Sequence, residues 1–443
     1  MYSVIARPWV EPQTCFAEAA GETYRVWLDS ALVSSESARY SILASNPFKL
    51  LVSKGDKIQI VEPHGTTRIE GNPFDVLDEH LALHRLESAE HPFPLGAAIG
   101  YFGYGLKNFV ERLPANAPDD LGLPDCWFGF YNDLQVFDHT EKKVWQITGP
   151  KGPTLRRSDA PTVPRFVGPL RSNFTRESYR AAIIRAKEYI AAGDVYQVNL
   201  SQRFQCGIDV TADDVYLALR ESNPGPYCAY LDTGAAQILS SSPECFLNIH
   251  GRRVVTRPIK GTRPRENGAG ADKRVAQELL ASPKDNAELV MITDLERNDL
   301  GRVCEFGTVR VTELVRVEPY ATVLHLVSTV EGQLRRDVSH VDCVRAGFPG
   351  GSITGAPKIR AMQIIDELEP HARGVYTGAI GFLGFNDVTH LNVAIRTIVY
   401  QDGRLTFHAG GGIVADSEPD AEYDETLVKA RGMLNAIENL RVR

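Results

Sequence analysis

Residues 195–204 alternate apolar and polar side chains with a period of two, and this pattern constrains the fold more than any other segment. It predicts a β-strand with one apolar face and one polar face. The apolar set is Tyr196, Val198, Leu200 and Phe204, and the polar set is Gln197, Asn199, Ser201 and Arg203. Such a strand lies either between a core and a polar cavity or at a solvent-facing sheet surface, and the pattern leaves both open.

The rest of the chain mixes strands and helices without a regular alternation. Short strand-like runs at 49–52 and 57–60 lie between Gly and Pro turns and predict antiparallel strands. After residue 165 helices are expected at 176–192, capped by Thr175 and stopped by Gly193, at 284–295, and after Ser417. This arrangement favours an α+β fold over a doubly wound sheet. Residues 148–164, rich in Pro and Gly, predict a linker between regions 1–165 and 166–443.

Composition excludes several classes of protein. The 443 residues carry a net charge of -8, which argues against a nucleic-acid partner. The first residues lack the pattern of a signal peptide, and no run reaches the roughly 18 apolar residues of a membrane span, so we expect a cytoplasmic protein without membrane contact. The seven cysteines are scattered without a C-x-x-C pair, so free thiols are expected.

A lysine lies among arginines at residues 256–265 (TRPIKGTRPR). Neighbouring positive charge would lower the pKa of Lys260 and favour a neutral, nucleophilic amine. Gly261 would let a ligand approach the backbone closely. The alternative is a solvated basic loop without catalytic function.

Two predicted helices place carboxylates on shared faces. Asp285 and Glu288 are three residues apart on the first, and Glu422 and Glu425 are three apart on the second, followed by Lys429. Carboxylates from separate helices suit Mg²⁺. Solvated helix faces would give the same pattern.

Further candidate binding and catalytic residues lie in the second half of the chain. Glycine-rich turns at 349–358 and 409–414 could form anion-binding nests. Arg396, in a predicted strand at 392–397, needs an anion, either a structural carboxylate or a substrate. His325 is either a core residue of a strand at 323–330 or a catalytic group, and Glu244 is either a general acid or a cap.

Several motifs in order resemble the chorismate-utilising enzymes. They are 193–200 (GDVYQVNL), 242–244 (SPE), the lysine loop, 294–302 (DLERNDLGR), 355–358 (GAPK), 395–397 (IRT), the glycine run and 422–430, with weaker matches at 27–30 and 38–41. The resemblance implies two stacked antiparallel β-sheets with helices packed outside. Lys260 and Gln197 are similar to the aminodeoxychorismate synthase component I branch, which acts in p-aminobenzoate and folate biosynthesis, whereas anthranilate synthases usually have alanine in place of Lys260.

The resemblance also implies roles for individual residues. Mg²⁺ would be held by Glu288 and Glu425 with support from Glu422 and Asp285. Lys260 would attack chorismate and Glu244 would protonate the leaving hydroxyl. The enolpyruvyl carboxylate would bind Arg396, Tyr376 and the amides of Gly411 and Gly412. The remaining expected contacts are Thr262, Gly261 and His325 beside the ring, and Arg297 and Arg302 behind the site.

Partners follow from the same resemblance. The chain lacks a recognisable glutaminase motif, so a separate glutamine amidotransferase is expected to supply ammonia. A tryptophan pocket is implied near Ser30, Pro226, Tyr227 and Cys228. One departure is Cys245, where the family commonly has arginine; on a strand it would point away from Glu244. Anthranilate synthase component I and a non-catalytic chorismate or tryptophan binder remain the alternatives.

Overall fold

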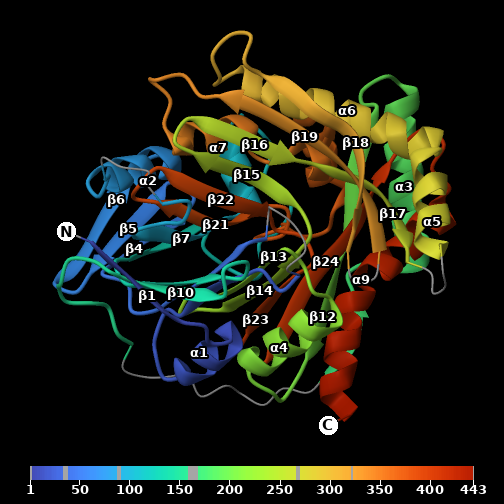
Figure 1. Ribbon diagram of the computed structural model, residues 1–443. Coiled ribbons are helices and arrows are strands. Elements are labelled where there is room, and N and C mark those ends of the chain that lie inside the picture. Colours follow the sequence, from blue (N-terminus) through green and yellow to red (C-terminus); the bar gives the residue numbers. More distant parts are fainter. Residues whose placement is uncertain are drawn as a thin grey trace.

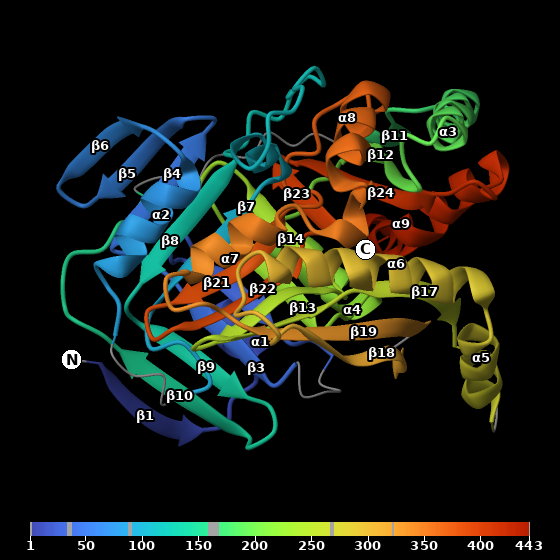
Figure 2. The ribbon, with the colours of Figure 1, turned by 90° about the horizontal axis from the view of Figure 1, so that it is seen from above.

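The computed structural model describes residues 2–32, 38–86, 91–157, 168–265, 270–320 and 323–442. Within them, two large antiparallel sheets lie face to face, with helices outside (Figures 1 and 2). This confirms the α+β prediction and the two stacked sheets. None of the described helices is long and apolar enough to cross a membrane.

The first sheet contains strands from both ends of the chain. In spatial order they are β1 (Ser3–Pro8), β10 (Lys143–Thr148), β9 (Leu134–Asp138), β3 (Tyr40–Ala44), β2 (Val26–Asp29), β13 (Tyr227–Asp232), β14 (Gln237–Ser242), β23 (Thr397–Gln401), β24 (Arg404–Ile413), β12 (Gln197–Gly207) and β11 (Gly168–Ser172), with β20 (Gly355–Ala356) paired to β12. The polar face of β12 is buried, since Gln197, Ser201 and Arg203 are at most 3% exposed. The solvent-facing alternative for this strand is therefore wrong.

The second sheet is also built from both regions. Its order is β17 (Ile259–Pro264), β19 (Val323–Gln333), β16 (Arg253–Arg257), β15 (Cys245–His250), β22 (Val388–Val393), β21 (Ala379–Gly384), β7 (Ala97–Phe102), β8 (Cys126–Tyr131), β4 (Lys49–Lys54), β5 (Lys57–Glu62) and β6 (Gly65–Glu70), with β18 (Arg310–Pro319) beside β19. The strands expected at 49–52 and 57–60 are confirmed as β4 and β5.

Helices cover the outer faces of both sheets. They are α1 (Pro12–Glu18), α2 (Pro73–Ala82), α3 (Arg176–Ala191), α4 (Ala212–Ser222), α5 (Ala271–Leu280), α6 (Pro283–Gly301), α7 (His340–Gly347), α8 (Lys358–Leu368) and α9 (Pro419–Val442), with 3₁₀ turns η1 (Tyr104–Phe109) and η2 (Gly351–Ile353). Helix α3 begins as predicted, with Thr175 and Ser178 forming a reciprocal capping box. Helix α6 continues to Gly301, beyond the predicted end at 295.

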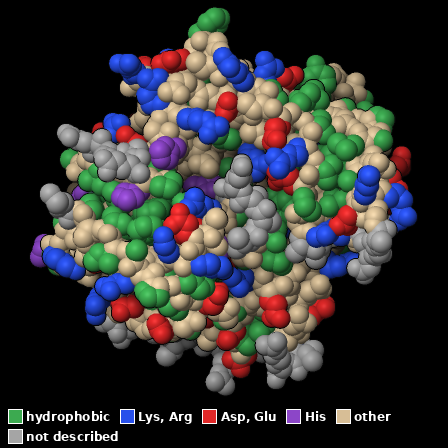
Figure 3. Space-filling model, viewed as in Figure 1, with side chains coloured by type: hydrophobic (Ala, Val, Ile, Leu, Met, Phe, Trp, Pro, Cys, Tyr) green, Lys and Arg blue, Asp and Glu red, His purple; other side chains and the backbone are tan. Residues whose placement is uncertain are grey.

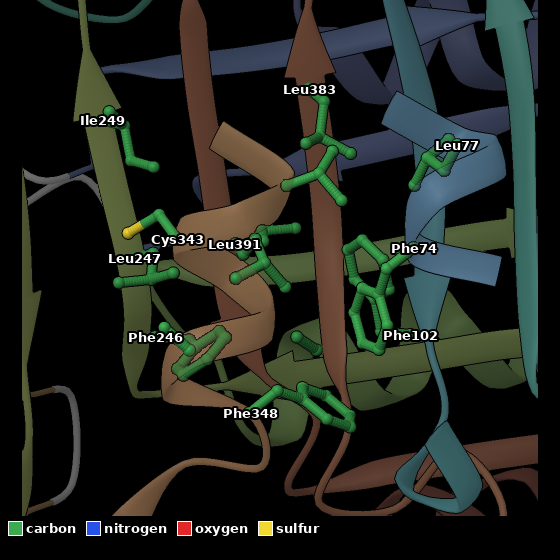
Figure 4. Close-up of a cluster of buried hydrophobic side chains, with 14 of the residues drawn as sticks. Phe74, Leu77, Phe102, Phe246, Leu247, Ile249, Cys343, Phe348, Leu383 and Leu391 are labelled. Atoms are coloured by element: carbon green, nitrogen blue, oxygen red, sulfur yellow. The ribbon is translucent and has the colours of Figure 1, made fainter. Parts of the chain in front are cut away.

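Alternation along the strands produces three layers of apolar contact. On β7, Ile99 and Tyr101 face the core between the sheets, whereas Ala98 and Phe102 face α2 and α7 on the outside. Figure 4 shows this outer cluster, with Phe74 of α2 against Phe102 and with α7 lying over β15 and β22. Helices α4 and α9 pack against the outer face of the first sheet.

The division expected near residue 165 stays a prediction, but the hydrogen bonding across it is extensive. Strand β2 pairs with β13 in the first sheet, and β7 pairs with β21 in the second. Of the expected linker, residues 149–157 run along the surface, where the Arg157 guanidinium donates to the Gly234 carbonyl, and residues 158–164 lie outside the described part. On the face shown in Figure 3, acidic and basic side chains are interspersed.

Candidate functional site

Lys260 lies on β17 at the end of the second sheet, where it faces α6 and α9. Its ammonium donates to the carbonyl of Ser352, in turn η2, at 3.0 Å. Burial lowers the pKa of Lys260, and the positive charge of Lys429 adds to this effect, whereas the carboxylates of Glu288 and Glu244 oppose it. The arrangement favours the neutral amine that a nucleophilic lysine requires.

The predicted reason for this pKa shift was partly wrong. Each of the three neighbouring arginines carries its own carboxylate: Arg257 pairs with Glu318, Arg263 with Asp285 at 2.7 Å, and Arg265 with Asp272 at 2.6 Å. Their charges are therefore compensated locally, and burial is the dominant cause. The segment is a paired strand rather than a solvated loop.

Glu244 lies between β14 and β15 and is 4% exposed. Burial raises the pKa of Glu244, while a hydrogen bond from Ser352 and the charge of Lys260 oppose the rise. A carboxyl group in this setting can hold a proton and act as a general acid. The next residue, Cys245, turns the other way, with its Sγ 3.7 Å from Nε2 of His390, so its departure from the family pattern does not touch the acid.

Two carboxylates of α9 lie beside Gly411, and Glu288 of α6 is close enough for the charge of Glu425 to act on it. A Cβ at Gly411 would lie 3.3 Å from Oε2 of Glu422 and from Oε1 of Glu425. Burial raises the pKa of Glu288, and the charge of Glu425 contributes. Asp285 instead binds Arg263, and Glu425 pairs with Lys429 at 2.7 Å.

These carboxylates partly fit a hard cation. Within the described ranges, no group of three or more His, Cys, Asp or Glu side chains is arranged as a metal site. The Ser417 hydroxyl donates to Oε1 of Glu422 at 2.6 Å, but the buried Oε2 has no hydrogen-bond partner. Burial raises the pKa of Glu422, and the nearby charge of Glu425 contributes. An unpartnered oxygen beside a glycine, with further carboxylates near it, is a donor set that Mg²⁺ prefers.

Arg396 lies in the turn between β22 and β23 with φ +50°, not in a strand as predicted. Its Nη1 donates to Oδ1 of Asn223 at 3.0 Å, and no carboxylate of the described residues forms an ion pair with it. Burial lowers the pKa of Arg396, because a desolvated cation without a counter-ion is costly. Such a guanidinium is well suited to bind an anionic ligand.

Tyr376 stacks on the ring of His408 at 4.9 Å, close to the buried Arg373–Glu369 ion pair. Gly411 and Gly412 belong to β24 and pair with Leu200 and Asn199, so the predicted glycine turn is wrong.

Gly412 makes room for Gln197. A Cβ at Gly412 would lie 1.8 Å from Nε2 of Gln197, and neither polar atom of this fully buried amide has a hydrogen-bond partner within the described part. The amide therefore has unused hydrogen-bonding capacity beside the glycine run.

His325 lies on β19 and is 2% exposed. Its Nδ1 shares a hydrogen bond with the Thr262 hydroxyl at 2.9 Å, while Nε2 is buried without a partner. Burial lowers the pKa of His325 to about 3, so the ring is neutral at physiological pH. Gly261, with φ +64°, lies against Asp285 and Leu279, which leaves no room for a side chain there.

Two predicted residues are not brought to this cluster. The exposed side chain of Arg297 pairs with Asp294, and Arg302 donates to the carbonyl of Ala346 on α7. Conversely, sequence reasoning missed Ser352, Asn223 and Glu296. The signal for Glu296 was available, because it lies eight residues after Glu288 and so shares its helix face.

The four residues predicted for a tryptophan pocket are brought together. Ser30, Pro226, Tyr227 and Cys228 line a cavity of about 350 Å³ that also includes Phe382 and His390 of the second sheet. The cavity therefore lies between the sheets, separate from Lys260, and a bound tryptophan stays a prediction.

Comparisons with known proteins agree with this geometry. Residues 28–435 match the chorismate binding enzyme family. The chain is 40% identical to aminodeoxychorismate synthase component 1 of Bacillus subtilis, covering 92% of this chain and 91% of that protein. It is also 40% identical to anthranilate synthase component 1 of Thermus thermophilus, covering 96% and 95%.

A solved structure extends the match to the fold. Anthranilate synthase component I of Streptococcus pneumoniae superposes with a TM-score of 0.78 at 33% identity, covering 91% of this chain and 93% of that one. The shared motifs, the shared sheets and the cluster around Lys260 lead to one assignment: the chain belongs to the chorismate-binding enzymes and is a chorismate-utilising enzyme.

Proposed function

We propose that this chain is component I of an aminodeoxychorismate synthase, which converts chorismate and ammonia to 4-amino-4-deoxychorismate. The observation that carries the proposal is Lys260, a partly buried lysine with a lowered pKa, held at Ser352 and close to Glu244. Where anthranilate synthases usually have alanine, this chain keeps a functional amine.

Binding of the substrate depends on charge compensation. Chorismate is a dianion, and Arg396 is a buried guanidinium without a carboxylate among the described residues. We place the enolpyruvyl carboxylate on Arg396 and Tyr376. The neutral imidazole of His325 and the Thr262 hydroxyl border the ring.

The chemistry uses two groups that both contact Ser352 of η2. The neutral amine of Lys260 attacks C2 of the ring, the double bond shifts, and the C4 hydroxyl leaves as water with the proton of Glu244. Ammonia then attacks C4 and displaces the lysine, which regenerates the amine. A glutaminase subunit is the proposed ammonia donor, in keeping with the "component 1" names of the relatives.

Mg²⁺ is the proposed cofactor. Glu288, Glu422 and Glu425 would hold it, with support from Asp285, whose Oδ2 binds Arg263. When bound, Mg²⁺ would supply positive charge for the ring carboxylate. We expect Glu425→Gln to raise the Mg²⁺ concentration required for half-maximal rate, and an unchanged requirement would contradict this assignment.

Product identification tests the proposal. Purified protein with chorismate, Mg²⁺ and ammonium should form an amino product that retains the enolpyruvyl group, detected by chromatography with mass detection. Lys260→Ala should abolish it, whereas Lys273→Ala, which removes an exposed lysine on α5, should not. Wild-type rates in the Lys260→Ala protein would refute the covalent step.

The second candidate is anthranilate synthase component I. Its support is specific, since such a relative is as similar in sequence as the aminodeoxychorismate synthase relative. Release of pyruvate together with a fluorescent aromatic amine would favour it.

A further inference from the structure

Glu296 is a buried carboxyl group that the proposed function does not use. It lies on the inner face of α6 and is 4% exposed. The N–H of Gly351 donates to its Oε1 at 3.2 Å, and no lysine, arginine or histidine of the described residues forms an ion pair with it. A buried carboxylate without a cation is costly, so this group favours its neutral acid form.

Three functional side chains converge on two consecutive residues of η2. Glu296 accepts the N–H of Gly351, Glu244 interacts with the side chain of Ser352, and Lys260 donates to the Ser352 carbonyl. A Cβ at Gly351 would lie 2.4 Å from Leu295, so the turn packs directly on α6 beside Glu296. Glu296 therefore contacts the same turn as the reacting acid and amine, and the charge of Glu244 acts on it.

The surrounding charges reinforce the neutral form. Burial raises the pKa of Glu296 to about 8, and the charges of Asp299 and Glu244 contribute, while Lys358 opposes them. The thiol of Cys245 is also near, and burial raises the pKa of that thiol to about 12, so it stays protonated. Ionisation of Glu244 therefore raises the pKa of Glu296.

We propose that Glu296 is a positioning residue that stores a proton beside Glu244 and returns it after Glu244 has protonated the leaving hydroxyl. This inference rests on the proposed function. In the transfer, the O–H bond of the Glu296 acid breaks, an O–H bond forms on the Glu244 carboxylate, and Glu296 becomes the anion. One solvent proton per turnover then restores Glu296, which balances the uptake of ammonia into a product that carries an ammonium group.

The structure provides a route for that solvent proton. Lys358 lies 2.5 Å from Asp299, one helical turn beyond Glu296. The charge of Arg302 also acts on Asp299, and Arg302 lines a surface hollow of about 490 Å³. Ionisable groups therefore extend from Glu244 through Glu296 and the Asp299–Lys358 pair to solvent.

Glu296→Gln removes the acidic proton but keeps the packing, because the amide oxygen can still accept the Gly351 N–H. We expect kcat for chorismate consumption at saturating ammonium to fall at least tenfold with kcat/KM for chorismate unchanged, since reloading follows the first irreversible step. Asp294→Asn, the same change on the exposed face of α6, should alter neither constant. A parallel fall in kcat and kcat/KM, or no change in either, would overturn the inference.

A second measurement does not depend on turnover. Buried carboxylic acids absorb in the infrared carbonyl region, and Glu244 and Glu296 should both contribute in the resting protein at neutral pH. The part due to Glu296 should be lost in Glu296→Gln, which leaves a weaker absorption, and the full absorption should be kept in Asp294→Asn; identical spectra of wild type and Glu296→Gln would overturn the inference. If the product is anthranilate, the proposed function fails, yet the kinetic comparison still applies because that reaction also expels the hydroxyl. A protein that consumes no chorismate, even with a glutaminase partner, would refute both.

Discussion

The guanidinium of Arg396 is oriented by Asn223. Asn223 ends α4, where its side chain accepts from the guanidinium and donates to the Ser241 hydroxyl at 2.7 Å. A neutral amide orients the cation without neutralising it. The charge of Arg396 therefore stays available for a ligand carboxylate.

Changing Asn223 should affect substrate affinity through this contact. A hydrogen bond to a charged group contributes about 1.5–3 kcal/mol, so Asn223→Ala should raise KM for chorismate by about tenfold or more. Asn223→Asp should raise it further, because its carboxylate would compete with the substrate for Arg396. Steady-state kinetics measure both, with the exposed Asn116→Ala as control. Better affinity in Asn223→Asp would contradict this role of Arg396.

Glu296 should also leave a signature in stability. Its pKa is raised from 4.5 to about 8 in the folded protein, so between these values the folded state binds more protons than the unfolded state. Stability from this group is present at low pH and declines as pH rises through that window, by about 1.4 kcal/mol per unit. Glu296→Gln removes the decline.

Denaturant unfolding at pH 5 and pH 8.5 measures this difference. The free energy of unfolding of Glu296→Gln, relative to wild type, should be higher at pH 8.5 than at pH 5. The exposed Asp294→Asn variant should follow wild type at both values. A constant difference between Glu296→Gln and wild type would mean that Glu296 is ionised throughout.

At the scale of elements, periodicity and capping residues predicted the helices and strands whose formation depends on local sequence. Helix α3 and strand β4 appear where capping and alternation placed them. Strand β12 begins two residues after the predicted start, so Tyr196 is exposed instead of lying on the apolar face. Periodicity could not show that both faces of β12 are buried, because that depends on packing against segments distant in sequence, such as α8. Arg396 was expected in a strand and the glycine run in a turn, because the local pattern does not show which distant strands a segment pairs with.

For the candidate site, the sequence likewise predicted the residues within motifs but not their partners from other elements. Lys260, Glu244, Glu288 and Glu425 were recognised from motifs, and the structure brings them together. The compensation of the arginines by Glu318, Asp285 and Asp272 was invisible, since those partners come from other elements. The charges that act on a side chain in the folded protein therefore cannot be read from its neighbours in the sequence alone.

The contact between β12 and β24 yields a prediction for Gly412. In Gly412→Ala the new Cβ would meet Nε2 of Gln197 at 1.8 Å. Strand pairing holds both backbones, Gly412 against Asn199 and Gln197 against Ala356. Overpacking of this kind costs about 1–3 kcal/mol. We expect a lower melting temperature and a loss of chorismate turnover, and Gln197→Ala in the same chain should restore the melting temperature.

Gly152→Ala provides the matched control, because nothing lies within 4 Å of its added Cβ. It should leave both melting temperature and rate unchanged. If Gly412→Ala behaved like Gly152→Ala, the close packing of Gln197 against the glycine run would be wrong.

At the scale of the whole molecule, the two regions of the chain complete each other's sheets. Removing residues 1–165 would expose the edge of β13 where β2 binds and the edge of β21 where β7 binds. It would also uncover the core between the sheets, where Trp127 and Tyr101 pack against Ile238 and Ile380. Open edges and exposed apolar surface promote aggregation.

We therefore expect residues 166–443 expressed alone to be insoluble or to lack a cooperative unfolding transition. Co-expression with residues 1–165 as a separate chain should restore a soluble complex, because the strand pairing does not require the connecting segment around 158–164. Size-exclusion chromatography and thermal unfolding of the two preparations measure this. A fragment 166–443 that folds cooperatively as a monomer would show that the catalytic region holds both sheets without its N-terminal strands, and that the division near residue 165 separates independent domains.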